Sequence, residues 1–217
     1  MMKKNGFTLA EVLITLAIIG VVATLTLPAL MTNTGEQQFI TGYKKMINTL
    51  SEAGQMNSAL AGWNYSDITE AGSSLTSSVD ETQNQNLASL LVNRTSLGTT
   101  SLGSITNGTD TRTNCAFFRD GSAVCLGTMA NNSTGKFNTV IVDVNGVKGP
   151  NKLSTCTKAN CTEKAGKNIK DQFYVTLYQG AAIPGKWTSV DTYGNDSYDK
   201  AALYAAGVSQ KETTSGS

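Results

Sequence analysis

The sequence offers few side chains for chemistry. None of the 217 residues is a histidine. A chain without histidine has no Ser-His-Asp or Cys-His catalytic arrangement, no imidazole proton relay and no histidine-ligated metal. The remaining candidates are one glutamate inside an apolar run, four cysteines and two groups of acidic and amide residues. None of them predicts catalysis, and we expect a protein that is not an enzyme.

Glu11 is the first candidate because it lies where a charge is costly. A nearly unbroken apolar run of 25 residues extends from Phe7 to Met31, and Lys3 and Lys4 precede it. As an α-helix it would be roughly 37 Å long, which exceeds the roughly 30 Å of a bilayer core. The positive-inside rule keeps the lysines in the cytoplasm and sends the rest of the chain across the membrane. A carboxylate within such a segment is a functional candidate with a charged partner.

Two simpler interpretations of this segment are a secretory signal peptide and a plain membrane anchor. The run is longer than a usual signal-peptide core, and no Ala-x-Ala cleavage site closes it. A plain anchor accounts for the length of the run but not for Glu11.

The four cysteines are the second candidate: Cys115, Cys125, Cys156 and Cys161. An even number of cysteines in an exported domain favours disulfides over free thiols. Three pairings are possible, and we favour Cys115–Cys125 across a hairpin together with Cys156–Cys161 closing a small loop. A zinc site of four cysteines is the alternative, but the intervals fit ribbon-type zinc sites poorly.

The third candidate is a pair of acidic and amide groups that suggests calcium, since oxygen ligands suit a hard cation. One group is Asp143 with Asn145 and backbone carbonyls, and the other consists of Asp191, Asn195, Asp196 and Asp199. Turn formation explains the same residues without a metal. We therefore assign no metal ligands and expect no cofactor, with structural calcium as the open alternative.

The charge balance argues against nucleic acid as a partner. Seventeen Lys and Arg residues face sixteen Asp and Glu residues, which leaves a net charge of +1. Such a chain has no large basic surplus for a phosphate backbone. A modest basic stretch contains Lys158, Lys164, Lys167 and Lys170. We interpret it as a solvated loop and predict no nucleic acid partner.

The elements that position these residues begin with one long helix, predicted from residue 7 to residue 61. Its first half is apolar on all sides. Its second half carries apolar residues at three- and four-residue steps, the spacing of one helical face: Phe39, Tyr43, Met46, Ile47, Leu50, Ala53 and Leu60. Pro28 either ends the membrane helix or kinks it between residues 28 and 35.

The remainder of the chain predicts a small β-rich head. More than half of residues 66–114 are Ser, Thr, Asn or Gly, which indicates loops with short elements, such as a helical turn at 87–92. Alternating or β-branched runs predict strands at 115–118, 123–126, 137–144 and 172–178, with a hairpin turn at 119–122. The fold class is therefore α+β, a long N-terminal helix packed on a small antiparallel sheet.

The stretch 6–14, Gly-Phe-Thr-Leu-Ala-Glu-Val-Leu-Ile, resembles the processing motif of type IV pilins and type II secretion pseudopilins. The resemblance implies cleavage after Gly6 by a prepilin peptidase and methylation of the new amino terminus at Phe7. It also implies that Glu11 pairs with the amine of a neighbouring subunit, and that Pro28 is the helix-kinking proline of many pilins. One small departure is Ala10, where a larger aliphatic residue is commoner.

A second, shorter resemblance lies in the head. The stretches 142–151 and 171–173 are similar to a pattern found in bacterial pilin-like proteins, some of which carry a structural calcium. The resemblance favours a pilin-like division of the chain. It comprises a leader at 1–6, a membrane and assembly half-helix at 7–35, an amphipathic half-helix at 36–62, a variable loop region at 63–114, a disulfide-bonded sheet head at 115–207 and a polar, unstructured tail at 208–217.

These features predict a structural subunit of a type IV pilus or a type II secretion pseudopilus. Its partners would be copies of itself, related pilin-like subunits, prepilin peptidase and an inner-membrane assembly platform. It would cross the bacterial inner membrane once, with its C-terminal domain outside the cytoplasm. The alternative is a membrane-anchored binding or adhesion protein that does not polymerise and that uses aromatic stacking surfaces, for which the candidates are Trp63, Tyr65, Trp187 and Tyr193.

Overall fold

The computed structural model describes residues 8–75, 85–132, 137–157, 161, 166–189, 192–193 and 196–208, without the side chains of 27–33, 129–132, 188–189 and 192–193. The chain divides into two units, Met1–Gln38 and Phe39–Ser217. Helix α1 (Leu9–Ala61) extends through the boundary between them. The second unit is called the head.

The N-terminal unit consists, in its described part, of the first half of α1. The helix begins at Leu9 and is not interrupted at Pro28 or Gly35. Its first 18 residues, Leu9–Thr26, are long and apolar enough to cross a membrane by length and composition. This length agrees with the membrane-spanning half-helix that the hydropathy pattern predicts.

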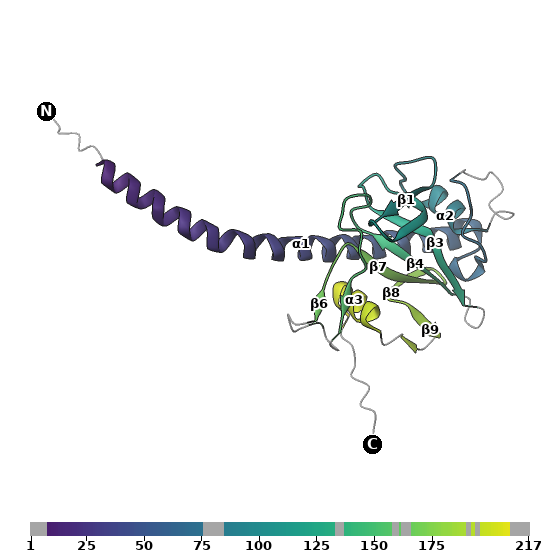
Figure 1. The fold of residues 1–217 in the computed structure, drawn as a ribbon. Helices are drawn as coiled ribbons and strands as arrows, with labels where there is room; N and C mark the ends of the chain where they lie inside the picture. Colours follow the sequence, from purple (N-terminus) through teal and green to yellow (C-terminus); the bar gives the residue numbers. More distant parts are fainter. Residues whose placement is uncertain are drawn as a thin grey trace, which may run out of the picture. The chain divides into compact units, whose positions relative to one another are not determined.

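The head is built on a six-stranded antiparallel sheet of order β1-β2-β3-β4-β7-β8 (Figure 1). The strands are β1 (Gly103–Thr106), β2 (Thr111–Phe117), β3 (Ala123–Asn132), β4 (Phe137–Asp143), β7 (Gln172–Tyr178) and β8 (Ala181–Pro184). In the centre of the sheet, β4 is buried along its whole length. Its β-branched residues suit such a central position.

Smaller elements surround this sheet. They are the 3₁₀ turn η1 (Tyr65–Asp67), helix α2 (Leu87–Arg94), the pairs β5 (Thr155–Cys156) with β6 (Lys167–Asn168) and β9 (Trp187–Ser189) with β10 (Thr192–Tyr193), and helix α3 (Ser197–Ala206). Asn64 caps η1 and Asn86 caps α2, each with a side chain that accepts a backbone N–H. Short polar caps of this kind explain how a Ser-, Thr- and Asn-rich stretch forms ordered elements.

The second half of α1 packs on one face of the sheet through its apolar stripe. Tyr43 is fully buried, and its ring stacks on that of Phe173 in β7 at a centroid distance of 4.3 Å. Its hydroxyl donates to the carbonyl of Tyr174 at 2.7 Å. The other buried α1 residues of this core are Ile40, Met46, Leu50 and Ala53. A sheet of this size gains its stability from such a covering helix.

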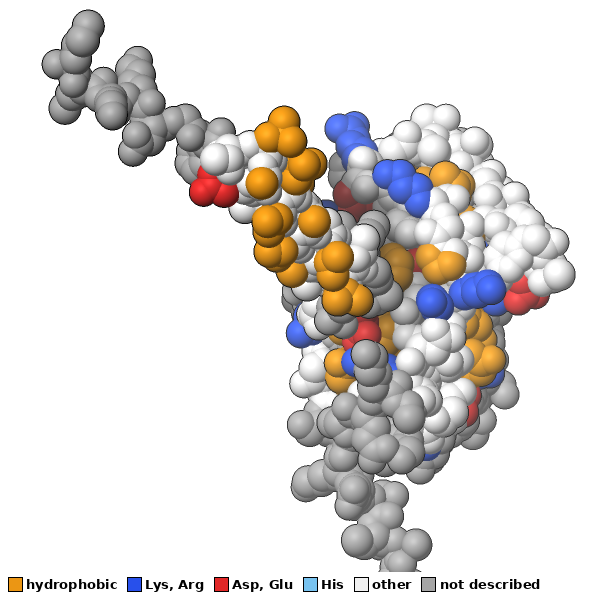
Figure 2. Space-filling view, turned by 60° about the vertical axis from the view of Figure 1, so that its left-hand side comes forward, with side chains coloured by type: hydrophobic (Ala, Val, Ile, Leu, Met, Phe, Trp, Pro, Cys, Tyr) orange, Lys and Arg blue, Asp and Glu red, His pale blue; other side chains and the backbone are white. Residues whose placement is uncertain are grey.

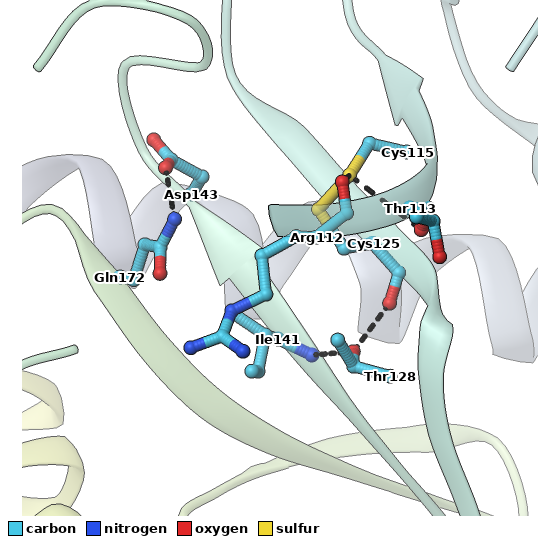
Figure 3. The surroundings of a disulfide bond; sticks show 8 residues. All are labelled: Arg112, Thr113, Cys115, Cys125, Thr128, Ile141, Asp143 and Gln172. Carbon is cyan, nitrogen blue, oxygen red and sulfur yellow. Dashed lines mark hydrogen bonds between the residues drawn. A yellow bond between two sulfur atoms is a disulfide. The ribbon is translucent and has the colours of Figure 1, made fainter. Parts of the chain in front are cut away.

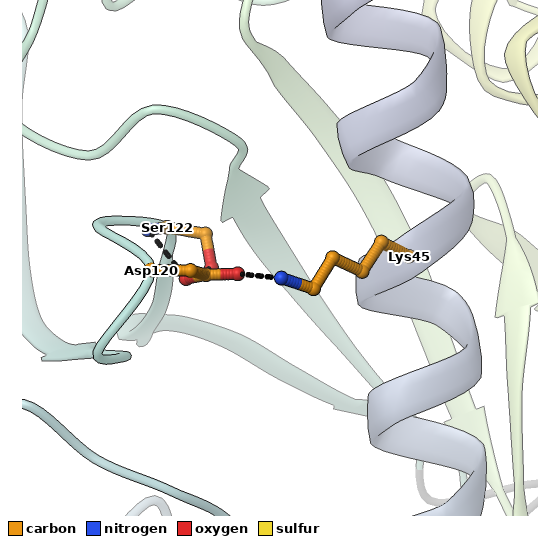
Figure 4. A network of polar contacts seen from close by, with 3 residues as sticks. All are labelled: Lys45, Asp120 and Ser122. Carbon is orange, nitrogen blue, oxygen red and sulfur yellow. Dashed lines mark hydrogen bonds and ion pairs between the residues drawn. The ribbon is translucent and has the colours of Figure 1, made fainter.

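An ion pair fastens the exposed side of α1 to the β2–β3 turn (Figure 4). Lys45 Nζ lies 2.7 Å from Asp120 Oδ2, and Ser122 donates to Asp120 Oδ1 from its hydroxyl at 2.6 Å and from its N–H at 3.0 Å. Burial alone would raise the pKa of Asp120, but the hydrogen bonds from Lys45 and Ser122 lower it below its ordinary value. Because the Lys45 side chain is 62% exposed, solvent screening limits this pair to about 0–1 kcal/mol.

Gly54 is a position where α1 lies in close contact with other parts of the head, and it gives a first testable prediction. A Cβ at this position would overlap the Tyr65 ring and lie 3.1 Å from the carbonyl oxygen of Gly180. Gly54→Ala should therefore destabilise the full chain by about 1–3 kcal/mol, although alanine is the better helix former. Urea unfolding in detergent micelles measures the change. Gly35→Ala is the matched control, because nothing lies within 4 Å of a Cβ there; equal effects of the two variants would contradict the close approach.

The α+β class and the pilin-like arrangement are confirmed. The strands expected at 137–144 and 172–178 correspond to β4 and β7, and the helical turn expected at 87–92 is α2. The sheet begins earlier than expected, because β1 and the first half of β2 lie within the stretch interpreted as a variable loop. Helix α3 has no counterpart among the sequence expectations. Most of the tail expected to be unstructured lies outside the described residues.

Candidate functional site

The apolar first half of α1 is the main candidate site. Figure 2 shows hydrophobic side chains gathered over this part of the helix. Within its own unit the helix buries none of the window Leu9–Thr26, and Leu9 is 79% and Leu25 75% exposed. An apolar surface of this extent favours a nonaqueous environment, either lipid or other apolar helices.

Three threonines inside this segment donate their hydroxyl hydrogens to backbone carbonyls of the same helix. Thr15 donates to the carbonyls of Glu11 and Val12 at 3.0 and 2.9 Å. Thr24 and Thr26 donate likewise to carbonyls three and four residues earlier. An unpaired hydroxyl in hydrocarbon costs several kcal/mol, so these bonds make the threonines compatible with a membrane core.

Glu11 is held in a capping box with Thr8. The Thr8 hydroxyl accepts the N–H of Glu11 at 3.3 Å, while Glu11 Oε2 accepts both the N–H and the hydroxyl of Thr8 at 2.9 Å. Such a box satisfies backbone groups that the first turn of a helix leaves unpaired. It also turns the Glu11 carboxylate toward the N-terminal end of α1. Sequence reasoning missed the role of Thr8, although the Thr-x-x-Glu spacing was its signal.

The other predicted residues of this site are only partly visible. Gly6 and Phe7, the processing residues, lie outside the described part of the chain. Pro28 lies within the helical backbone of α1, but its side chain is not described. The roles assigned to these three residues stay predictions.

Both disulfides join the cysteine pairs that the spacing favoured. Cys115 in β2 faces Cys125 in β3, with Cα atoms 3.9 Å apart (Figure 3). Cys156 pairs with Cys161 across a short loop. Beside the first bond, Thr128 donates to the carbonyl of Cys125 at 2.6 Å and accepts the N–H of Ile141 at 3.0 Å. With all four thiols oxidised, a zinc site of four cysteines is excluded.

The acidic stretch after β4 forms a buried polar network that we call the clasp, consisting of Asp143, Asn145, Asn151, Asp171 and Gln172. Asp143 is fully buried and accepts hydrogen bonds from Gln172 Nε2 at 2.9 Å and from the N–H of Asn145 at 3.1 Å.

On the other side of the clasp, Asp171 is also fully buried. It accepts the N–H of Asn151 at 2.7 Å and that of Lys152 at 2.9 Å. Asn151 also donates from Nδ2 to the carbonyl of Thr106 in β1 at 3.0 Å. The clasp therefore ties the loop after β4 to β7 and β1, and its carboxylates are occupied by N–H donors.

Burial makes the clasp sensitive to pH. It is the main cause that raises the pKa of the Asp143 carboxyl to about 7, and the neighbouring Asp171 acts in the same direction, whereas hydrogen bonds from Gln172 and Asn145 oppose it. Burial likewise raises the pKa of Asp199 to about 7, against the N–H of Lys186. Because these values exceed the roughly 3.9 of an unfolded aspartate, folding favours the protonated forms.

We therefore expect these two carboxyls to reduce stability as the pH rises from about 4 to about 7, with no further change from them above that range. Asp143→Asn should flatten the dependence of the unfolding free energy on pH across this window. Urea unfolding of the full chain in micelles at several pH values measures the slope. Glu70→Gln, at an exposed position, should leave the slope unchanged. A slope in Asp143→Asn equal to that of the unmodified chain would contradict the expected titration.

Two members of the second acidic group, Asp196 and Asp199, lie close together at the start of α3. Asp196 caps α3 by accepting the N–H of Tyr198 and Asp199, while Asp199 accepts the N–H of Lys186. Asp191 and Asn195 lie outside the described residues. Among the residues that the structure describes, no three acidic or cysteine side chains gather as a metal site. The expectation of no cofactor stays a prediction, with structural calcium as its open alternative.

The aromatic surface suggested for a binding protein is not available in full. Trp63 is 3% exposed and Tyr65 is fully buried, because both belong to the core beneath α1. Trp187 is half-buried, and the side chain of Tyr193 is not described. In the basic stretch, Lys167 lies over the Tyr204 ring at 4.9 Å, whereas Lys158 and Lys164 lie outside the described residues.

Comparison with known proteins supports the N-terminal site. Residues 1–27 match the family model of the prokaryotic N-terminal methylation motif, which is the signature of type IV pilins and pseudopilins. No curated protein matches the chain, and no solved structure matches it. The match covers the processing residues, Glu11 and most of the apolar helix, and it leaves the head without a counterpart.

Proposed function

We propose that this chain, which carries the N-terminal methylation motif of type IV pilins and pseudopilins, is a structural subunit of a type IV pilus or a type II secretion pseudopilus. One observation carries the proposal: the matched motif continues directly into a helix whose apolar surface is exposed along its first 18 residues. The precursor is cleaved after Gly6, methylated at Phe7 and held in the inner membrane by α1, with the head outside the cytoplasm.

During assembly, the apolar surface of α1 leaves its contact with lipid and packs against the helices of other subunits. Packing the exposed apolar side chains of several helices together removes them from lipid without exposing them to water. Cleavage creates a positively charged amine at Phe7, next to the residue that holds the Glu11 carboxylate. In a low-dielectric helix bundle an unpaired charge is strongly penalised. A neighbouring amine that replaces the Thr8 hydrogen bonds on Glu11 therefore selects one stagger between subunits.

Other proteins carry out the cleavage, the methylation and the assembly of this chain. A prepilin peptidase cleaves and methylates the precursor, and an inner-membrane platform assembles copies of this chain with related pilin-like subunits. The family that the motif marks is structural, and we assign no catalytic residue to this chain.

The test is the intact mass and N-terminal sequence of the membrane-extracted protein, coexpressed with a prepilin peptidase and, as the control, without it. A chain that starts at Phe7 and is heavier by one methyl group, found only with the peptidase, is the expected result. A chain that keeps its leader despite an active peptidase would overturn the proposal. The remaining candidate would then be a membrane-anchored domain that does not polymerise.

A further inference from the structure

We propose that two surfaces of the head bind each other between successive copies of this chain. The helix patch consists of Glu52, Met56 and Leu60 on α1, and the loop patch consists of Val147 and Lys148 after β4. This inference rests on the proposed function and names the contact that the heads make in the filament.

The helix patch is an apolar surface that remains exposed among the residues that the structure describes. Met56 is 49% and Leu60 69% exposed. Glu52, also exposed, precedes Met56 by four residues, and Met56 precedes Leu60 by four. Residues at this spacing lie on the same side of a helix, one turn apart. The patch therefore presents two large apolar side chains in line with a carboxylate.

The loop patch combines one apolar side chain with one cation, and hydrogen bonds hold its loop in place. Val147 is 68% exposed, and Lys148 beside it is exposed as well. The clasp fixes both ends of the loop through the bonds of Asp143 and Asp171 to backbone N–H groups. A preorganised loop loses little conformational entropy on binding.

The two patches match in chemistry. The exposed large hydrophobic side chains of the described head are Met56, Leu60, Val147, Tyr198 and Val208. Most of these side chains therefore belong to the two patches. Within the described part of the chain neither Glu52 nor Lys148 forms an ion pair. Apposition of the patches buries Val147 against Met56 and Leu60, and it places the Lys148 ammonium beside the Glu52 carboxylate.

The positions of the patches within the head predict an open assembly. Gly42 is the α1 residue beside the loop, since a Cβ there would meet Val144. Met56 and Leu60 are 14 and 18 residues further along α1, or roughly 21–27 Å at 1.5 Å per residue. Because the two surfaces differ, their contact is heterologous and does not close a two-fold dimer. Because the patches are offset along α1, each copy is shifted along the helix axis, so the contact repeats without closing a ring.

The experiment uses charge reversal in the full chain, expressed with its own assembly machinery and measured as subunit in sheared filaments. We expect Glu52→Lys and Lys148→Glu each to reduce filament yield about tenfold, and the double variant to recover most of it, because the restored pair has opposite charges again. Val147→Asp should also reduce the yield. The matched control is Val208→Asp at an exposed valine outside both patches, which should assemble normally. The amount of processed subunit in the membrane should be the same for all variants.

The outcomes separate this inference from the proposed function. Filaments of the unmodified chain together with normal yields from both single reversals would overturn the contact and leave the proposed function intact. Failure of the double variant to recover, with normal processing, would also overturn the contact. If the unmodified chain is processed and supplied with its machinery yet forms no filament, the proposed function is wrong, and the contact is wrong with it.

Discussion

Glu11→Ala should insert into the membrane and be cleaved after Gly6, yet yield at least about tenfold fewer filaments than the unmodified chain. Removing a carboxylate from an apolar segment lowers the cost of insertion. Assembly suffers, because the amine of a neighbouring Phe7 then enters a low-dielectric bundle without a partner. Subunit recovered in sheared filaments, relative to processed subunit in the membrane, measures the effect. Normal filaments would contradict the role of Glu11 in the stagger.

Two further variants separate the charge of Glu11 from its place in the capping box. Glu11→Gln keeps an oxygen that can accept from Thr8 but removes the charge, so it should assemble as poorly as Glu11→Ala. Thr8→Val removes the hydroxyl of the box and keeps the charge, at a helix-capping cost of about 1 kcal/mol. It should therefore assemble better than Glu11→Gln. The opposite order would assign the effect to capping, not to the pairing of charges.

The N-terminal helix could be predicted from sequence because its determinants are local. An apolar run of sufficient length and the three- and four-residue steps that follow it require no knowledge of distant residues. The same holds for β4 and β7, whose β-branched and aromatic residues suit buried strands. The capping role of Thr8 was not predicted, because a glutamate within an apolar run indicates a charge in a membrane segment before it indicates a helix cap.

Helix α3 was not predicted from sequence, although both of its ends carry recognisable caps. Its N-cap at Asp196 and its left-handed C-cap at Gly207, with φ of 78°, are standard helix signals. Its buried face, however, is made largely of Ala201, Ala202 and Ala205. Small residues give a weak hydrophobic pattern, and tertiary packing decides their state.

The clasp depends on contacts that local reasoning does not contain. Turn chemistry correctly predicts the bends around Asn145, but the bond from Asn151 to Asp171 joins residues 20 positions apart. The carboxylate of Asp143, which the sequence offers as a candidate calcium ligand, accepts hydrogen bonds from Asn145 and from Gln172 of β7 in the folded head. Residue type alone does not distinguish the two uses, because both need buried oxygen acceptors.

Removal of the Cys115–Cys125 disulfide should give the largest loss of head stability among the cysteine variants. The bond closes a loop with a sequence separation of 10 and joins neighbouring strands in the main sheet. Chain entropy predicts a loss of roughly 3 kcal/mol for a loop of this length. Alanine is the proper replacement for both cysteines, because both positions are fully buried and a serine pair would add buried hydroxyls to the loss.

The second disulfide is the matched comparison for this variant. Cys156 and Cys161 are separated by 5 residues, so the same reasoning predicts roughly 2 kcal/mol for the Cys156→Ala/Cys161→Ala pair. Urea unfolding of the full chain in detergent micelles, under nonreducing conditions, compares the two pairs with the unmodified protein. Loss of the strand-to-strand bond should also lower the amount of subunit in the membrane, since unfolded heads are degraded. Equal unfolding free energies of the two variants would contradict the prediction that loop length controls the loss of stability. Packing around Cys115 and Cys125 would then have to compensate for the greater loss expected from the longer loop.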